Sequence, residues 1–340
     1  MKNIFDILER DYAWRIFKNK KLVYFPELKD KDLIAVEIEK ISPSWAKETC
    51  LAKYEVLFSG DIIKIIRGKA SLNEATRQAW QIMEYLYSRG FSDGQSQIAR
   101  PLDFIEENNF LLYEEVPGTP LSLVVQGGDF DKISACFKKA AVWLAKLHEI
   151  KAGEENLPAA VFIKSNDFVD IFSRLANLFP GLKDDLISES ELKFMADIQA
   201  ERKNLLHNDF YPGNIIIGQE IVYGIDFEKS GLGSRWLDVA TFLGWLAFPT
   251  AIQQFDLTQK KIQELHTVFL EAYCSACQLD YLSAQQSLNK YLAKIYLDQI
   301  YYYAVFCVKG WDFFGANDKH DYEIKIKALL QEVNQNLKRF

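Results

Sequence analysis

A short polar segment followed by two apolar runs is the feature of this 340-residue chain that most constrains its fold. The segment, residues 207–214, reads His-Asn-Asp-Phe-Tyr-Pro-Gly-Asn, so that Asp209 and Asn214 lie five residues apart. Asp226 follows twelve residues after Asn214, at the end of the second apolar run. Short apolar runs separated by a glycine-containing turn predict a pair of strands. We therefore expect Asn214 to open one strand and Asp226 to close the next, with both ends at one point.

Two carboxylates and an amide at this spacing suit phosphoryl transfer from Mg-ATP, which needs alignment and charge neutralisation more than covalent chemistry. Because Mg²⁺ takes oxygen ligands, Asn214 and Asp226 are the predicted metal ligands. Asp209 is predicted to accept the proton of an attacking hydroxyl or to orient it. His207 is predicted to brace the loop by hydrogen bonding. The alternative is that Asp209 and Asn214 only cap turns, and the strand pair with its Asp-Phe makes this alternative the weaker one.

These residues resemble the aminoglycoside phosphotransferase and choline kinase superfamily, whose members carry motifs such as H-G-D-x-x-P-G-N and I-D-F-E/G. Here the motifs read His-Asn-Asp-x-x-Pro-Gly-Asn at 207–214 and Ile-Asp-Phe-Glu at 225–228, variants that look more like choline and ethanolamine kinases. Residues 144–148, Leu-Ala-Lys-Leu-His, are similar to the family's L-A-x-L-H helix. The resemblance implies that Asp238, in Trp-Leu-Asp-Val-Ala, holds the catalytic loop by hydrogen bonds.

The resemblance also implies an α+β, two-lobed protein-kinase-like fold with ATP and Mg²⁺ as cofactors. We expect residues 1–116 to form an N-terminal helix and a β-rich nucleotide-binding lobe, and residues 117–340 to form a mainly helical catalytic and acceptor-binding lobe. The pattern along the chain agrees, because strand-like segments fill the first third and helical periodicity dominates after residue 236. Three late helices are expected at 258–278, 283–309 and 320–338.

In the N-terminal third, residues 54–66 read as a β-hairpin with a Ser-Gly turn, and Lys64 interrupts its second, apolar strand. A charged residue there is costly unless it has a partner. The resemblance makes Lys64 the lysine that binds the ATP phosphates, and the alternative is a lysine that faces solvent. Residues 71–89 have helical spacing, and this helix is expected to supply the partner, Glu74, with Glu84 as the alternative.

Residues 110–118 read as a strand that ends at Pro-Gly. By resemblance this is the hinge, where backbone groups of Glu114, Glu115 and Val116 bind ATP through its adenine. One departure from the family pattern concerns the loop at 41–49, which contains no glycine although backbone cradling of phosphates favours it. The choice between ATP and GTP therefore stays open.

The acceptor site is the part that the sequence constrains least. Glu228 follows Asp226 closely and favours an amine-bearing acceptor. The C-terminal third is rich in aromatic residues, which can enclose a quaternary ammonium by cation–π contact. Trp311 and Asp312 are the acceptor candidates there. Aromatic residues at helical spacing are more often core residues, and this alternative stays open.

Composition narrows the class of partner. The net charge of −7 disfavours nucleic acid and mildly favours a cationic or neutral substrate. The sequence has no run of eighteen apolar residues, so no membrane span is expected. Five scattered cysteines are typical of a reducing compartment, and a cytoplasmic location is predicted. The expected partner is a small molecule with a hydroxyl group, and the oligomeric state stays open.

Three functions are compatible with these motifs. The first is a kinase acting on a small molecule such as an amino-alcohol (choline or ethanolamine), an aminoglycoside or a sugar. The second is a catalytically weak or inactive pseudokinase, which the glycine-free loop favours. The set of Lys64, Asp209, Asn214 and Asp226 opposes it, because a binding module has no need of all four. The third is a protein kinase, but Trp236 follows Asp226 by only ten residues and leaves no room for a long activation loop. The first is predicted.

Overall fold

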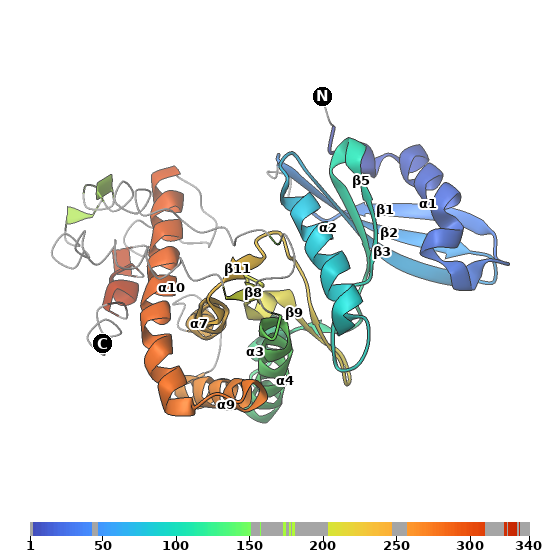
Figure 1. Cartoon of the computed structure of the whole chain (residues 1–340). Helices are drawn as coiled ribbons and strands as arrows, with labels where there is room; N and C mark the ends of the chain where they lie inside the picture. Colours follow the sequence, from blue (N-terminus) through green and yellow to red (C-terminus); the bar gives the residue numbers. More distant parts are fainter. Residues whose placement is uncertain are drawn as a thin grey trace. The chain divides into compact units, whose positions relative to one another are not determined.

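The computed structural model describes residues 3–42, 47–150, 203–246 and 257–309, with a few positions between 157 and 180 and between 323 and 333. The chain divides into two compact units (Figure 1). Unit 1 comprises Met1–Gly118 and Ile216–Lys229, and unit 2 comprises Thr119–Ile215 and Ser230–Phe340. The expected boundary after residue 116 therefore lies close to the first crossing at Gly118, but residues 216–229 return to unit 1.

Five antiparallel strands form the main sheet of unit 1, in the spatial order β1-β2-β3-β6-β5. They are β1 (Leu33–Lys40), β2 (Thr49–Phe58), β3 (Ile62–Ser71), β5 (Pro101–Ile105) and β6 (Phe110–Glu114). The β2–β3 turn contains Gly60 at φ +84° and Asp61 at φ +58°, and both residue types accept the left-handed region more readily than most. The predicted hairpin is present, but β3 continues five residues beyond Ile66.

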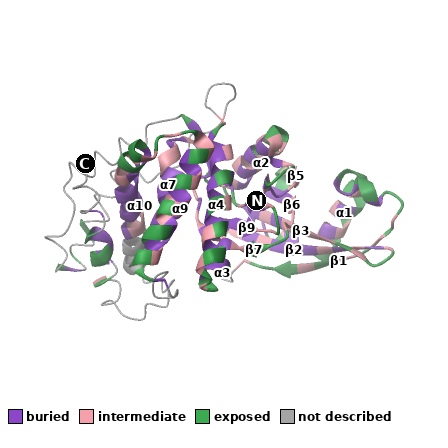
Figure 2. Cartoon of the chain, turned by 90° about the horizontal axis from the view of Figure 1, so that it is seen from below, coloured by how far each residue is buried: buried purple, intermediate pink, exposed green. Residues whose placement is uncertain are grey.

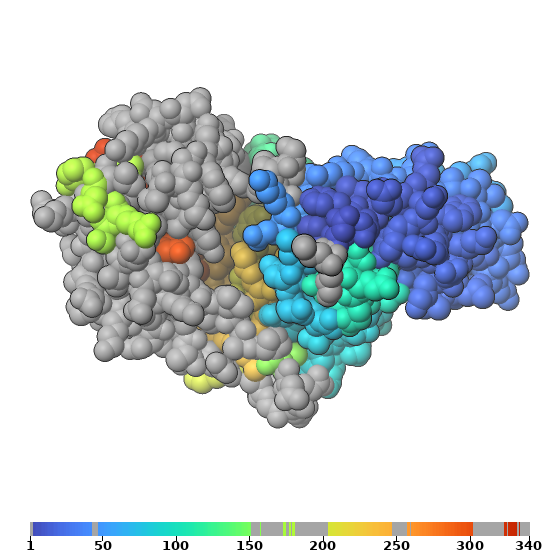
Figure 3. All heavy atoms as spheres, turned by 90° about the horizontal axis from the view of Figure 1, so that it is seen from above, coloured from blue at the N-terminus to red at the C-terminus, as the bar shows by residue number. Residues whose placement is uncertain are grey.

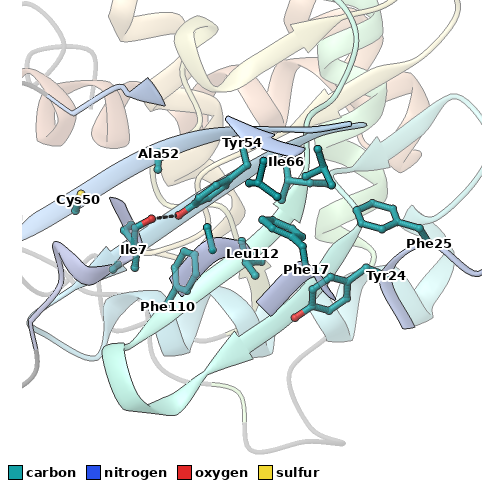
Figure 4. Packing of buried hydrophobic residues seen from close by; sticks show 14 of the residues in the cluster. Ile7, Phe17, Tyr24, Phe25, Cys50, Ala52, Tyr54, Ile66, Phe110 and Leu112 are labelled. Atoms are coloured by element: carbon teal, nitrogen blue, oxygen red, sulfur yellow. Dashed lines mark hydrogen bonds between the residues drawn. The ribbon is translucent and has the colours of Figure 1, made fainter. Parts of the chain in front are cut away.

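One face of this sheet packs against helix α1 (Arg10–Tyr24). Every second residue of β2 is buried on this face, as expected for a strand with one face in the core. Figure 4 shows the aromatic contacts, in which the rings of Phe17 and Tyr54 lie 5.4 Å apart and the Tyr54 hydroxyl donates to the carbonyl of Ile7 at 2.6 Å. The other labelled members of this core are Tyr24, Phe25, Cys50, Ala52, Ile66, Phe110 and Leu112.

The opposite face packs against helix α2 (Ala75–Leu86), which contacts β3, β5 and β6. Its buried residues include Ala79, Ile82, Met83 and Leu86, an apolar stripe at helical spacing. The N-terminal residues, dark blue in Figure 3, lie on the surface of unit 1. The sheet of unit 1 is thus covered by one helix on each face.

A second, smaller sheet brings the later segment into unit 1. Strand β10 (Val222–Gly224) pairs in parallel with β4 (Ser96–Ile98) and lies beside β9 (Ile215–Ile217). The two strands predicted on either side of Gly218 are therefore present. Because Asp226 comes two residues after the end of β10, this pairing attaches Asp226 to unit 1.

Unit 2 is mainly helical. Its helices are α3 (Leu121–Gln126), α4 (Phe130–His148), α7 (Arg235–Leu246), α9 (Gln259–Cys277) and α10 (Tyr281–Lys309). Its strands are β7 (Thr119–Pro120), β8 (Asn204–Leu206) and β11 (Gly231–Gly233), of which β8 and β11 pair antiparallel.

Helix α4 packs against α9, and α7 packs against α10. Buried residues, purple in Figure 2, occupy long stretches of α4 and α10. The N-caps of α4 and α9 are Asp129 and Thr258, whose side chains accept from the N–H three residues on, as preferred caps do.

The mixed α+β class is confirmed, with a β-rich first unit and a helical second one. The helices predicted at 258–278 and 283–309 correspond to α9 and α10, whereas most of the segment 320–338 lies outside the described residues. In the described part of the chain, no helix combines the length and apolar character that a membrane crossing requires.

Candidate active site

The loop that contains Asp209 belongs to unit 2, where it connects β8 to the 3₁₀ turn Pro212–Asn214. Asp238 of α7 is fully buried, and its two carboxylate oxygens accept from the backbone N–H groups of His207 and Asn208, both at 2.7 Å. Asn208 has φ +60°, a conformation that asparagine adopts more readily than most residues. The predicted role of Asp238, holding this loop by hydrogen bonds, therefore agrees with its contacts.

A second layer of contacts fixes Asp238. His148, the last residue of α4, lies with Nε2 3.0 Å from Asp238 Oδ2 and Nδ1 2.7 Å from the Tyr273 hydroxyl. Burial lowers the pKa of His148 although Asp238 opposes the shift, so the ring is neutral. The neutral ring donates from Nε2 to the carboxylate and accepts the Tyr273 hydroxyl at Nδ1. Sequence reasoning singled out the His148 helix but not Tyr273.

His207 braces the loop mainly through its backbone. Its N–H donates to Asp238, and its carbonyl accepts from the Ser230 hydroxyl at 2.9 Å. Its ring packs edge-on against Trp143 and Phe210. The ring of Phe210 also stacks on Trp143 at 5.6 Å, so the residue next to Asp209 is anchored in the core of unit 2.

Asp209 and Asn214 lie together within unit 2. The Asn214 amide Nδ2 donates to the Asp209 carbonyl at 3.0 Å and to its carboxylate Oδ2 at 3.2 Å. These bonds orient the Asn214 side chain, which is almost fully buried. They use the amide nitrogen, so the amide oxygen is the atom that could bind a metal ion.

In unit 1, Asp226 lies at the end of β10 with φ +68°, another left-handed position. Its Oδ1 is 3.0 Å from Nζ of Lys69, and Oε2 of Glu228 is 2.8 Å from the same nitrogen. Burial alone would lower the pKa of Lys69, but the two carboxylates outweigh it and raise that pKa above its ordinary value. Burial also raises the pKa of Glu228, against the effect of Lys69.

The structure therefore places Lys69, and not the predicted Lys64, beside Asp226. Lys64 and Lys69 are five residues apart on β3, so their side chains point to opposite faces of the sheet. Lys64 forms an ion pair with Glu27 at 2.7 Å, whereas Lys69 lies on the face toward α2. The prediction missed this because it ended the strand near Ile66. Reading the strand through Gly68 to Ser71 would have revealed a lysine on each face.

The glutamate predicted on the following helix as the partner of Lys64 also lies elsewhere. Glu74 precedes α2, is 72% exposed and pairs with Arg77 at 2.8 Å. The alternative, Glu84, has a pKa raised by burial and by the charge of Asp103. Neither glutamate contacts Lys64 or Lys69 among the described ion pairs, because the face of α2 toward Lys69 carries Ala79 and Met83.

The hinge residues lie at the end of β6. The backbone N–H groups of Glu114 and Glu115 donate to the carbonyls of Arg100 and Ile65, both at 3.0 Å. The Glu114 carboxylate pairs with Arg100 at 3.1 Å, and that of Glu115 pairs with Arg67. These backbone N–H groups serve the sheet, so the N–H of Val116 is the better candidate for a bond to adenine.

A small cavity opens beside Lys69 in unit 1. Its lining combines the three charged groups with apolar side chains of α2, β6 and the segment after β10. The residues are Lys69, Ala79, Met83, Ala99, Leu111, Tyr113, Ile225, Asp226, Phe227 and Glu228. Burial raises the pKa of Tyr113 to about 12, so this phenol stays neutral and can only donate or accept a hydrogen bond.

Each unit, taken by itself, offers oxygen atoms of the kind that suits a hard cation. In unit 1, Asp226 offers a carboxylate, and Oε1 of Glu228 is buried with no hydrogen-bond partner among the described residues. In unit 2, Asn214 offers an amide oxygen. Such oxygen atoms are the ligands that Mg²⁺ prefers. The remaining candidates, Trp311 and Asp312, lie outside the described residues.

Comparison with known proteins identifies the family. Residues 54–276 match the model of the phosphotransferase enzyme family, APH, which covers well over half of the chain. The chain belongs to this family. The resemblance drawn from the two motifs is thereby confirmed. No match was found among curated proteins.

Solved structures of this fold are similar along most of the chain. An ethanolamine kinase from Plasmodium vivax has 16% identity and a TM-score of 0.58, with 96% of this chain and 89% of that chain covered. A choline kinase from Cryptosporidium parvum has 11% identity and a TM-score of 0.56, with 89% and 90% covered. A thermostable mutant of aminoglycoside phosphotransferase APH(4)-Ia, in complex with ADP and hygromycin B, has 14% identity and a TM-score of 0.53, with 93% and 98% covered. At these identities the likeness shows the fold, which is protein-kinase-like as predicted.

Proposed function

We propose that this phosphotransferase is an ATP- and Mg²⁺-dependent kinase that phosphorylates a hydroxyl group of a small molecule in the cytoplasm. The observation that carries the proposal is the loop in unit 2, where buried Asp238 accepts from the backbone N–H groups of His207 and Asn208, the two residues before Asp209. A loop with two such charge-assisted bonds is pre-organised, and this is what a transfer that depends on alignment requires.

Each residue then has a specific part. The Asp209 carboxylate accepts the proton of the acceptor hydroxyl or orients that hydroxyl. Lys69 binds phosphate oxygens of the nucleotide, and Val116 binds adenine through its backbone. Asp226 and the amide oxygen of Asn214 would hold Mg²⁺, which supplies charge neutralisation for the phosphoryl group when it is bound. The residues predicted to contact the acceptor are Glu228, Trp311 and Asp312.

Three acceptor classes are compatible with the family: amino-alcohols such as choline and ethanolamine, aminoglycosides, and sugars. The acidic net charge and the Asp-Phe-Glu form of the second motif support an amine-bearing acceptor. The similar structures include an ethanolamine kinase and a choline kinase. We therefore place amino-alcohols first among the acceptors to be tested.

The experiment is a measurement of ADP release with Mg-ATP and a panel of choline, ethanolamine, aminoglycosides, amino sugars and polyols. Acceptor-stimulated turnover is expected, and Asp209→Ala should lower it by about 10²–10⁴-fold, the usual contribution of acid–base help. Omission of Mg²⁺ should abolish it. Binding of Mg-ATP without stimulation by any acceptor would favour the pseudokinase alternative. Full activity of Asp209→Ala would remove this residue from the mechanism.

A further inference from the structure

Lys69 is held by two carboxylates that come from one short segment after β10. Its Nζ lies 2.8 Å from Oε2 of Glu228 and 3.0 Å from Oδ1 of Asp226. The side chains differ in exposure, which is 13% for Lys69, 22% for Glu228 and 40% for Asp226. The contact with Glu228 is thus the shorter and the better protected from water, where an ion pair has more effect.

The helix that packs beside Lys69 supplies no acid to it. Among the described residues that line the cavity, Asp226 and Glu228 are the only acids, and α2 contributes Ala79 and Met83. Glu74, at the start of α2, is instead engaged by Arg77. A lysine on a flexible four-carbon stem needs a fixed partner if its ammonium group is to stay in one place.

We propose that Glu228 is the positioning residue that holds Lys69 ready for the nucleotide phosphates, in place of a glutamate on helix α2. This inference rests on the proposed function, because it assigns Glu228 a part in binding the nucleotide. This role, in which Glu228 acts through Lys69, replaces the acceptor contact for which Glu228 was predicted. The corrected assignment of Lys69 and the role of Glu228 are therefore one arrangement, contained entirely within unit 1.

Asp226 is less suited than Glu228 to hold the ammonium group of Lys69 in place. Asp226 is the more exposed of the two acids and is the proposed metal ligand. A carboxylate oxygen that coordinates Mg²⁺ is no longer a full acceptor for an ammonium group. Glu228 binds Lys69 through Oε2, and among the described residues its buried Oε1 has no hydrogen-bond partner. Lys69 is therefore the described contact that offsets the cost of burying this charge.

A double-mutant cycle tests the proposal with Lys69→Met, Glu228→Gln and the double variant. The first readout is the dissociation constant of a non-hydrolysable ATP analogue, measured with Mg²⁺ and with EDTA, and the second is the kcat and KM for ATP. Each single variant should weaken analogue binding by about 3- to 100-fold, the coupling range of residues in one ion-pair network. The double variant should bind no more weakly than Lys69→Met.

Matched controls come from the same strand. Lys64 and Glu27 form an ion pair of 2.7 Å on the other face of the sheet. Lys64→Met and Glu27→Gln should leave analogue binding unchanged. Thermal melting of all variants checks the fold, and Glu228→Met, of similar volume, replaces Glu228→Gln in the cycle if the glutamine variant does not fold.

The outcomes separate the alternatives. Losses that multiply in the double variant would overturn the proposal, because Glu228 would then act independently of Lys69. A loss that appears with Mg²⁺ but not with EDTA would also overturn it, in favour of metal binding by Glu228. If the unaltered chain binds no analogue under either condition, the proposed function itself is rejected, whereas binding with multiplicative losses rejects the role of Glu228 alone.

Discussion

At the scale of single residues, the position of Asp226 requires both a left-handed backbone conformation and a carboxylate. Its backbone has φ +68°, and its carboxylate lies 3.0 Å from Lys69. Left-handed backbone costs an ordinary L-residue about 1–2 kcal/mol, and Asp and Asn adopt it more easily. The position is therefore restricted both by its conformation and by its chemistry, and a substitution can separate the two.

Replacement of Asp226 by Asn keeps a residue that tolerates this conformation and removes the negative charge. We expect kcat to fall by about 10²-fold or more, the loss that follows removal of one group stabilising charge in a transition state. Asp226→Ala should show the same loss of activity and be less stable than Asp226→Asn by about 1 kcal/mol, because alanine tolerates positive φ less well. Urea unfolding and steady-state kinetics check both parts. Equal stability of the two variants would contradict the conformational argument.

At the scale of secondary structure, strand β3 shows both a feature that the sequence could predict, the hairpin, and one that it could not, the lysine beside Asp226. The hairpin, both motif strands and the late helices follow from local periodicity and turn residues. The identity of the lysine does not, because it depends on which face of β3 meets α1 and which meets α2. This is a property of tertiary packing: Lys69 pairs with Leu111 of β6, and both side chains line the cavity on the face toward α2.

Gly68 of β3 lies against two aromatic rings, one from each neighbouring strand. A Cβ at this position would lie 2.6 Å from Cε2 of Phe110 and 2.7 Å from Cε2 of Tyr54. Gly68→Ala should therefore lower the free energy of unfolding by about 1–3 kcal/mol, the cost of overpacking a core. Ile63→Ala, at a position of β3 that is 54% exposed, should cost much less. Urea unfolding compares the two, and an unchanged midpoint for Gly68→Ala would show that both rings can move aside.

The support behind the loop at residues 207–214 is an arrangement of helices α4, α7 and α9. Tyr273→Phe removes the hydroxyl that bonds Nδ1 of His148 at 2.7 Å, and the buried nitrogen left without a donor costs about 1–3 kcal/mol. We expect a lower kcat with little change in KM for ATP, because Asp238 and the loop lose their fixed orientation.

The control for this variant is Tyr291→Phe. It also removes a buried tyrosine hydroxyl, but the hydroxyl of Tyr291 accepts from Ser234 at 2.8 Å, whereas that of Tyr273 bonds His148. It should therefore cost stability with little effect on kcat. Equal kinetic effects of the two variants would mean that Tyr273 contributes only to packing. Steady-state kinetics and thermal melting are the measurements.

At the scale of the whole molecule, buried neutral histidines connect stability to pH. His266 of α9 donates from Nε2 to the carbonyl of Leu243 at 3.0 Å, and burial lowers the pKa of His266 to about 4, although that bond opposes the shift. The pKa of His148 is lowered by burial as well. An unfolded histidine titrates near pH 6.5. Between pH 6.5 and about 4, the unfolded chain therefore binds a proton at position 266 that the folded chain does not bind.

Since stability rises with pH wherever the unfolded state binds more protons, this group should destabilise the fold progressively as the pH falls below 6.5 and have no effect above it. The slope contributed by His266 is at most about 1.4 kcal/mol per pH unit. Urea unfolding between pH 7.5 and pH 5 should therefore show a smaller loss of stability for His266→Gln than for the unaltered chain, with the two pH profiles parallel above pH 7. Profiles that stay parallel down to pH 5 would show that His266 is protonated in the folded protein.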